Sequence, residues 1–405
     1  MRLKTRLQLS TLMFLQYFIW GAWYVTLGTY MLTNLHFNGT QVGLAYGTFA
    51  IAAMISPFFV GLIADKFFAT EKVLGTLHLV GAVLLYFAST VKVFPVFYPS
   101  LLAYTLCYTP TMALSNSLAF HQMKDPGQEF PSIRVLGTIG WIIAGLIIGF
   151  MAFEASVNQL YLSSIASLIL GVYCFTLPHV PPKKQSGSSL KQIIGLDALA
   201  LLKERSFAIL IIASILTCIP LSFYFSFTNP FLNDIGMVNA AGKMTMGQMS
   251  EFIFLLAMPF FFKRLGVKKM IMLGMSAWLL RYILFSMGNV DGLVWMLYLG
   301  IILHGICYDF FFVTGQIYVD TKAPSHLRSS AQGMITFATY GLGMVIGTWF
   351  CGKTVDFFTV TEGEKILYQW DKIWYVPGFF AVIILVLFGL MFREKRKAKG
   401  KSIRY

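Results

Sequence analysis

Charged side chains are scarce in this 405-residue sequence, since Asp, Glu, Lys and Arg together make up only 12% of it. A soluble globular domain carries about twice that share. Apolar residues make up 57% and the mean hydropathy is +0.71, so a water-soluble enzyme is excluded. At roughly 20 apolar residues per span, the chain is long enough for about twelve transmembrane helices and leaves little for a domain outside the membrane.

Paired cysteines and catalytic motifs are also missing. The five cysteines stand singly inside apolar runs with no CxxC spacing, which argues against a disulfide framework or a metal site and favours small core residues. Neither the zinc-protease motif HExxH nor the hydrolase motif GxSxG occurs in the sequence. We therefore expect neither an enzyme nor a metal or organic cofactor.

Apolar runs predict where the chain crosses the membrane. The first run is too long for a signal peptide and is interpreted as a retained span. The expected spans lie near 9–33, 41–62, 73–92, 97–120, 131–152, 157–178, 206–232, 242–262, 268–288, 293–320, 328–352 and 373–392.

The formal net charge of +14 is explained by membrane topology. With both termini in the cytoplasm, 24 of the 31 Lys and Arg residues fall on the cytoplasmic side of the predicted spans. Basic residues favour cytoplasmic loops. We therefore expect a multi-pass protein of the cytoplasmic (inner) membrane whose partner is the lipid bilayer, and not a nucleic-acid-binding protein.

One long polar break divides the predicted spans into two sets. It separates an N-terminal bundle of six helices (1–178) from a C-terminal bundle of six (206–392), with a basic cytoplasmic tail (393–405) at the end. The break itself (179–205) contains LKQIIGLDALALLKER, whose apolar spacing predicts a short amphipathic helix. This helix lies either on the membrane surface or in the cytoplasm as a coupling helix.

The two sets of spans echo each other at an offset near 200 residues. Cys107-Tyr108-Thr109 matches Cys307-Tyr308-Asp309, and the glycine pair Gly145 and Gly149 matches Gly343 and Gly347. A parallel duplication of six spans is the arrangement of major facilitator transporters, whose substrate lies between two halves that rock. The fold class expected is therefore an all-α polytopic membrane protein with 12 transmembrane helices in two six-helix bundles.

The end of the second predicted span resembles a loop motif of the same superfamily. Gly61, Asp65 and Lys66 fit its pattern G-x-x-x-D-R/K. A glycine there permits close helix approach, and the acid and base can latch onto a neighbouring helix end in one conformation. We interpret these residues as a gate; the alternative is an ordinary capped helix end.

Two carboxylates lie near the middle of predicted spans, where a charge costs about 2.5 to 3.5 kcal/mol on insertion scales. Glu251 and Asp309 are these residues. An apolar environment favours the protonated form of a carboxyl group, as proton coupling requires. A static ion pair with Arg281, which is also at mid-depth, or with Arg134, three residues beyond Pro131 in the fifth span, is the competing interpretation.

Polar and aromatic residues share helix faces near these carboxylates. Arg134, Thr138 and Trp141 stand at i, i+4 and i+7, and could hydrogen-bond and stack a ribose or a base. Alternatively, Arg134 extends to the cytoplasmic interface and Trp141 faces lipid.

Further polar residues share faces in later spans. Gln248 stands three residues before Glu251, and His304 four before Tyr308. Either pair could contact a polar substrate or join helices by hydrogen bonds.

Several segments resemble the bacterial nucleoside:proton symporter family of the major facilitator superfamily. They are FIWGAWYVTLGTYM (18–31), FPSIRVLGTIG (130–140), GQMSE (247–251), YDF (308–310) and SAQG (330–333). The first includes Trp20 and Trp23, with Gln16 just before it, which form either a cavity wall or an aromatic packing stripe. The resemblance runs through nearly the whole chain and implies twelve helices, inward transport and proton coupling.

The chain departs from well-known members of this family at recognition positions. Those members carry Gln and Asn on span seven, where this sequence aligns Ser222 and Phe225, and Tyr at the position of His304. Because of these departures, the resemblance predicts the fold more firmly than it predicts the substrate.

The resemblance implies proton-coupled uptake of nucleosides, with the proton as coupling ion. The alternatives are a proton symporter for a sugar or other small polar solute, and a transport-dead sensor. We expect a monomer.

Overall fold

A computed structural model describes residues 2–59, 68–182 and 196–393 of the chain. Nearly all of these residues are helical, which confirms the expected helical class. Within the described part of the chain, the sheet consists of one antiparallel hairpin, β1 (Thr359–Glu362) and β2 (Lys365–Tyr368). Gly363 adopts a positive φ of 63° at its turn.

The N-terminal helices are those described before residue 183. Their bounds are α1 (Leu3–Gly21), α2 (Leu27–Thr33), α3 (Gly39–Phe59), α5 (Thr70–Thr90), α6 (Phe94–His121), α7 (Pro126–Phe150) and α8 (Asn158–Cys174).

The C-terminal helices are those described from residue 196 onward. Their bounds are η2 (Leu196–Lys203), α10 (Arg205–Asp234), α11 (Ala240–Met287), α12 (Val294–Ile302), α13 (His304–Tyr308), η3 (Asp309–Val313), α14 (Thr314–Lys322), η4 (Ser325–Leu327), α15 (Arg328–Thr336), η5 (Phe337–Gly343), α16 (Met344–Phe357) and α17 (Trp370–Met391). The segments η3 and η5 are π-helical, and both lie inside longer, otherwise α-helical runs.

In the described residues, seven helical runs are long and apolar enough to cross a membrane. Their outward faces carry large apolar side chains such as Phe150, Leu256 and Leu390, which are 86%, 67% and 71% exposed. Exposed apolar surface of this kind suits contact with lipid. The protein is therefore a multi-pass membrane protein.

Helix α11 covers two of the expected spans, 242–262 and 268–288, without a separate loop. Gly266 lies inside it with φ 68° and ψ 176°, which breaks the helix there. Residues 30 positions apart in a straight helix would be about 45 Å apart. Glu251 and Arg281 instead both contact His304, so the chain folds back at Gly266.

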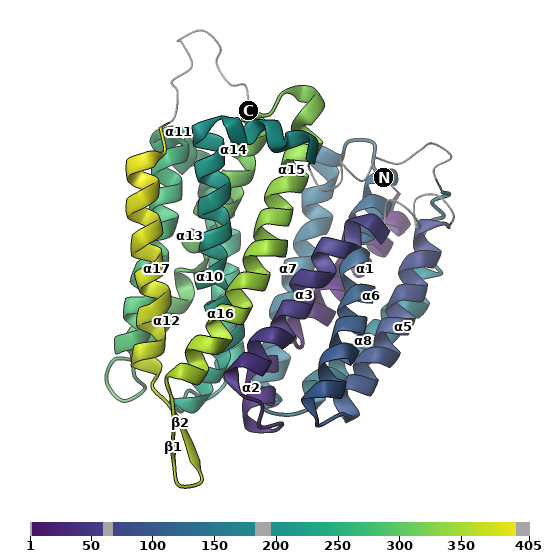
Figure 1. The fold of residues 1–405 in the computed structure, drawn as a ribbon. Coiled ribbons are helices and arrows are strands. Elements are labelled where there is room, and N and C mark those ends of the chain that lie inside the picture. The colour runs from purple at the N-terminus through teal and green to yellow at the C-terminus, as the bar shows by residue number, and fades with distance from the viewer. Residues whose placement is uncertain (1, 60–67, 183–195, 394–405) are drawn as a thin grey trace.

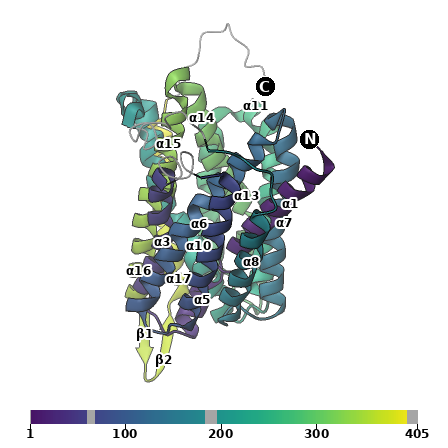
Figure 2. The same ribbon diagram turned by 90° about the vertical axis from the view of Figure 1, so that its right-hand side faces the viewer.

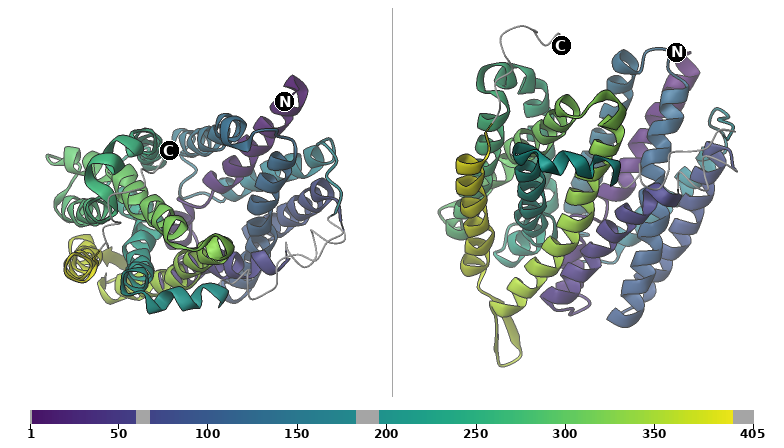
Figure 3. Two further views of the ribbon diagram at one scale, coloured as in Figure 1. Left: turned by 90° about the horizontal axis from the view of Figure 1, so that it is seen from above. Right: turned by 45° about the horizontal axis from the view of Figure 1, so that its top comes forward.

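The N-terminal and C-terminal helices form two groups that lie side by side, purple to blue and teal to yellow in Figure 1 and, seen from above, in Figure 3. Their contacts include α3 with α16 and η5, α2 with α10, and α7 with α11. The hairpin projects from one end of the molecule, while α1 begins and α17 ends at the other (Figures 1 and 2).

Glycines allow the two groups to approach closely at the hairpin end. A Cβ at Gly43 of α3 would collide with the carbonyl oxygen of Thr348 in α16, and one at Gly28 of α2 with that of Ser226 in α10. Gly149 of α7 similarly lies against Asn239 at the start of α11. The helix backbones therefore meet directly at this end.

Several expectations concern the core and the connections. Four of the five cysteines are buried and Cys107 is partly buried, all as free thiols. Residues Leu196–Lys203 of the linker form the short helix η2. The expected gate residues Gly61, Asp65 and Lys66, residues 183–195 of the linker and residues 394–405 of the tail lie outside the described residues.

Candidate functional site

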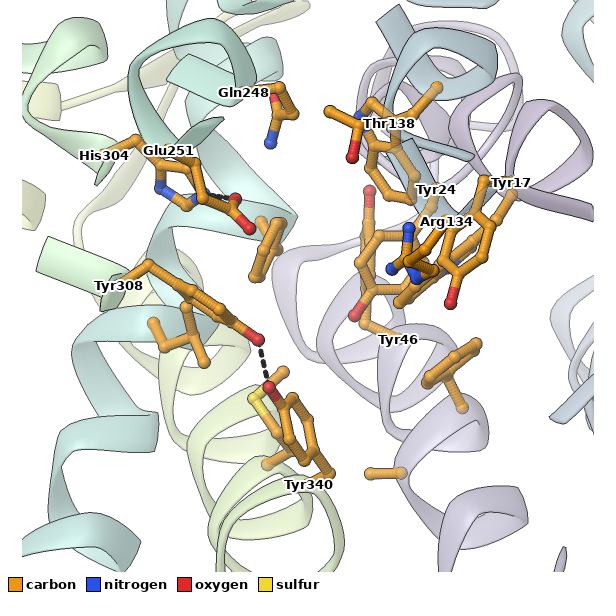
Figure 4. A pocket seen from close by; sticks show the side chains of 17 residues that line it. Tyr17, Tyr24, Tyr46, Arg134, Thr138, Gln248, Glu251, His304, Tyr308 and Tyr340 are labelled. Atoms are coloured by element: carbon orange, nitrogen blue, oxygen red, sulfur yellow. Dashed lines mark hydrogen bonds and ion pairs between the residues drawn. The ribbon is translucent and has the colours of Figure 1, made fainter. Parts of the chain in front are cut away.

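A cavity of about 920 Å³, including the space at its open part, lies between the two groups of helices. The walls facing each other come from α1, α3 and α7 on one side and from α10, α11, α13, η5 and α16 on the other (Figure 4). The side chains that line it are Tyr17, Trp20, Tyr24, Tyr46, Phe49, Ala50, Arg134, Thr138, Trp141, Leu221, Phe225, Gln248, Glu251, His304, Tyr308, Tyr340 and Met344.

Most of the residues expected at the site lie together on these walls. They are Arg134, Thr138, Trp141, Phe225, Gln248, Glu251, His304 and Tyr308. The three residues of α7 point into the cavity from one helix face, as their spacing requires.

Ser222 and Asp309 lie outside this lining. Ser222 is fully buried, and its hydroxyl group donates a hydrogen bond of 2.7 Å to the carbonyl oxygen of Cys218 one turn earlier. Asp309 is 1% exposed at the start of η3. These two residues are therefore not in contact with the cavity in this conformation.

Aromatic rings form much of the wall that the N-terminal helices supply. Trp20 stacks on Phe49 at 4.8 Å between ring centroids and meets Trp141 edge-on at 4.9 Å. Tyr24 contacts Phe225 across the two groups at 5.6 Å. Sequence reasoning named Trp20, but it did not identify Tyr17, Tyr24, Tyr46, Phe49 or Tyr340 as cavity residues.

The residues around Trp20 divide between cavity and core. Trp23 is buried, and Gln16 is held by hydrogen bonds from its amide to Thr111 at 2.7 Å and with His78 at 2.9 Å. Since aromatic residues make up 16% of the chain, only the packing of neighbouring helices decides which rings face the cavity.

Arg134 is a cation on the cavity wall. The guanidinium carbon lies 3.9 Å from the centroid of the Tyr17 ring. Among the described residues, the ion pairs within 4.0 Å include neither Arg134 nor Arg281. A static ion pair of either arginine with Glu251 or Asp309 is therefore not formed in this conformation.

The wall formed by the C-terminal helices contains a connected set of polar groups. Glu251 is one-third exposed, and its Oε2 lies 3.7 Å from Nε2 of the buried His304. The hydroxyl groups of Tyr308 and Tyr340 contact each other directly (Figure 4). The cavity therefore presents a carboxylate, an imidazole and phenol groups on one wall.

Asp309 is a buried carboxylate that accepts no hydrogen bond from the part of the chain described here. Neither of its carboxylate oxygens has a hydrogen-bond partner among the described residues. Burial of an ionised carboxylate without a partner costs several kcal/mol. Such a group needs either a neutral form or a functional reason to be there.

Hydrogen bonds seal the hairpin end of the molecule. Glu154, in the connection after α7, accepts hydrogen bonds from the side-chain amides of Asn229 and Asn233 at 2.7 and 2.6 Å and from the backbone N–H of Ala241 at 3.1 Å. In the part of the chain that the structure describes, every side-chain hydrogen bond between residues 2–182 and 196–393 lies at this end.

A second carboxylate seals the same end. Asp356, near the end of α16, accepts hydrogen bonds from the backbone N–H groups of Gly39 and Thr40 at 2.6 and 2.9 Å. These groups are at the start of α3, where free N–H groups and the helix dipole favour an anion. We call Glu154, Asp356 and their partners the hairpin-end latch.

One sequence pattern at this end has no phosphate-binding role. Residues 347–354 read GTWFCGKT, which matches the pattern G-x-x-x-x-G-K-T of nucleotide-binding loops. The segment lies inside α16, and Gly352 packs against the backbone of Gly39. Its glycines serve helix packing, because a phosphate site of this type requires a loop between a strand and a helix.

Known proteins match this chain along nearly its whole length. A family model described as Nucleoside H+ symporter matches residues 3–397. The Escherichia coli protein YegT is 43% identical over 97% of this chain and 95% of its own, and the xanthosine permease of the same organism is 36% identical over 98% and 99%. A crystal structure of the nucleoside transporter NupG, 33% identical, superposes with a TM-score of 0.89 over 97% of this chain and 100% of that one.

Proposed function

Because this chain belongs to the nucleoside H+ symporter family, we propose that its central cavity binds a nucleoside and that a carboxylate on its wall carries the coupling proton. The protein is a membrane transporter, not an enzyme, and its activity is proton-coupled nucleoside uptake. The remaining proposals concern which residues perform that activity.

The composition of the cavity wall carries the proposal for the substrate. A nucleoside combines a flat aromatic base with a polar ribose. Trp20, Trp141 and Phe225 can stack on the base. Arg134 and Gln248 approach from opposite walls and can hydrogen-bond to base edges or ribose hydroxyls (Figure 4).

Glu251 is the carboxylate that we assign to proton exchange in this conformation. The side chain of Glu251 is 33% exposed, whereas Asp309 is only 1% exposed. Water in the cavity can therefore reach the carboxylate of Glu251 but not that of Asp309. A proton on Glu251 removes the cost of moving an uncompensated charge through an occluded state. Asp309, buried and without hydrogen bonds, then stays neutral in this state and exchanges its proton in another.

Alternating access requires that one end of the cavity be closed while the other opens. The hairpin-end latch closes one end here. Described basic residues of the predicted cytoplasmic side lie at the opposite end, such as Lys4 at the start of α1 and Lys268, which contacts Gly389 near the end of α17. We therefore infer that the latch faces outward and that this conformation faces the cytoplasm. The inference also assigns both termini to the cytoplasmic face of the inner membrane.

The domain organisation that we propose follows from the same topology. Two bundles of six transmembrane helices, 1–178 and 206–392, would be joined by the linker 179–205 and followed by the tail 393–405. The offset repeat supports this division. The contacts between α7 and α11 at the hairpin end are those that must open when the bundles rock. We propose that a monomer performs the cycle, since the cavity is formed within one chain.

Uptake into transport-deficient bacteria tests the proposed site. Cells expressing the chain should accumulate radiolabelled uridine or adenosine. An excess of unlabelled nucleoside should reduce this uptake, and an excess of unlabelled sugar should not. Trp141→Ala should raise the KM more than Trp141→Phe, which keeps an aromatic ring. Competition by sugars instead of nucleosides would refute the proposal for the substrate.

A further inference from the structure

Arg281 is a buried cation that forms no ion pair with a carboxylate of the described residues. Its side chain is 0% exposed, and Nε donates a hydrogen bond of 2.9 Å to the carbonyl oxygen of Gly300. The guanidinium carbon lies 4.1 Å from the Tyr224 ring centroid and 4.9 Å from that of Trp278. Because a buried charge without an ion pair is costly, this arginine calls for a role beyond packing.

The contact between Arg281 and His304 restricts where the imidazole can carry its hydrogen. Nη1 of Arg281 lies 3.4 Å from Nδ1 of His304. A guanidinium group has donors and no acceptor, so Nδ1 can only be the acceptor in this contact. A neutral imidazole then carries its hydrogen on Nε2, the nitrogen that faces Glu251.

The imidazolium form of His304 is disfavoured by the same contact. Protonation of Nδ1 would place an N–H donor against the guanidinium donor. It would also place two positive charges a few ångströms apart inside the protein, where such repulsion is weakly screened.

We propose that Arg281 is a positioning residue that keeps His304 neutral, with its hydrogen on Nε2, so that Glu251 faces a fixed hydrogen-bond donor. This rests on the proposed role of Glu251. The coupling proton then has one acceptor on this wall. A carboxylate oxygen of Glu251 takes the proton from hydronium in the cavity, so that one O–H bond breaks and another forms, a water molecule is left, and the histidine is unchanged.

The present geometry leaves Glu251 room to respond. The 3.7 Å between its Oε2 and Nε2 of His304 exceeds a hydrogen bond, and rotation of the partly exposed carboxylate can close it. When Glu251 is protonated, the Nε2–H group becomes available to an acceptor on the substrate. His304 thereby connects protonation with substrate binding.

Other titratable groups surround His304, and the substitution of Arg281 described below leaves them unchanged. From α11 these are Glu251 and Arg281; from α10 it is Tyr224, whose ring stacks on His304 at 4.6 Å between centroids. Tyr308 and Asp309 follow on the same run of helix, and Arg134 faces Glu251 across the cavity (Figure 4). Of these, Arg281 alone contacts Nδ1 within the described residues.

Nitrogen NMR of histidine-labelled protein in lipid nanodiscs tests the tautomer directly. His304→Phe keeps a ring against Tyr224 and assigns the His304 signal, among six histidines, by its disappearance. We expect a bare Nδ1 and a protonated Nε2 at neutral pH. A hydrogen on Nδ1 or an imidazolium signal at neutral pH would overturn the proposal.

Substitution of Arg281 tests the cause. In Arg281→Met, the imidazolium form of His304 should appear at a higher pH than in the wild type, because the neighbouring positive charge is gone while the burial of His304 remains. Arg281→Lys keeps the positive charge and should keep the imidazole neutral. If R281K titrates as R281M does, the charge is not the cause and the proposal is refuted. If R281M does not fold, the tautomer of His304 in the wild type and the titration of His304 in R281K still test the proposal.

Transport supplies a readout that a merely structural role would not change. The pH profile of uptake by R281M should gain a second transition on its acidic side, and the double variant R281M/H304F should lose it. A transition that persists in the double variant would contradict the proposal. A wrong tautomer refutes this inference and leaves the proposed role of Glu251 intact. Proton coupling that survives Glu251→Gln refutes the proposed role of Glu251, while the tautomer of His304 is still decided by the NMR signal.

Discussion

Removal of the negative charge from Glu154 should open the hairpin end of the molecule. The carboxylate is 4% exposed and accepts three hydrogen bonds from α10 and α11. Glu154→Gln keeps the shape of the side chain but places an amide N–H₂ group where an acceptor is needed. At least one charge-assisted hydrogen bond, worth about 1.5 to 3 kcal/mol, is then lost. The loss affects only the conformation in which this end is closed.

The lost interaction should shift the population between closed and open forms of that end. A difference of about 1.5 to 3 kcal/mol corresponds to a factor of about 10 to 150. Ala50 lines the cavity and is 2% exposed, so Ala50→Cys provides a thiol that an external reagent reaches only after opening.

The assay measures how fast a membrane-impermeant thiol reagent labels A50C in intact cells. The rate should rise by about 10-fold to 150-fold in A50C/E154Q relative to A50C. The parent chain without A50C gives the background from the native cysteines. Glu129→Gln is the matched control, because Glu129 accepts hydrogen bonds from Lys124 and Asp125 within one group of helices. Equal labelling in A50C and A50C/E154Q would refute the latch.

Two further predictions concern the latch and the cavity. Gly43→Leu should also speed external labelling of A50C, because the leucine side chain would collide with the backbone of Thr348 in the closed form. Unchanged labelling in a folded variant would show that the contact between α3 and α16 does not hold this end closed. Arg134→Met should raise the KM for uptake about tenfold or more, since a hydrogen bond from a charged group is worth about 1.5 to 3 kcal/mol. Arg134→Lys should have an intermediate KM. An unchanged KM in Arg134→Met would show that Arg134 does not bind the substrate.

Much of the candidate site could be predicted from the sequence because helix periodicity is local. The spacing of Arg134, Thr138 and Trp141 determines that they share a face of α7. The pairs in α11 and α13 follow in the same way. The cost of a charge in lipid then identified Glu251 and Asp309 without any alignment.

The remaining features depend on packing that local spacing does not contain. Asp309 directly follows Tyr308 and begins the π-helical segment η3, yet only Tyr308 lines the cavity, since neighbouring residues of a helix do not share a face. Tyr340 faces the cavity from the other π-helical segment, η5. Departures of this kind from regular α-helix are not visible in a hydrophobic pattern with a period of 3.6 residues.

Tertiary contacts also decide the chemistry of Arg281. Its depth in a predicted span suggested an ion pair with one of the two carboxylates. The guanidinium group instead contacts aromatic rings, a carbonyl oxygen and Nδ1 of His304. These partners come from segments far apart in the sequence, and only the fold brings them together.

The central claim is that this cavity couples nucleoside uptake to protonation of Glu251. The most direct test compares radiolabelled uridine accumulation by the wild type and by Glu251→Gln, with and without a protonophore. Asp291→Asn, an exposed carboxylate in the connection before α12, serves as the control. We predict that accumulation above the external concentration is abolished by the protonophore and by E251Q but not by D291N. Protonophore-sensitive accumulation that persists in well-expressed E251Q would contradict the account.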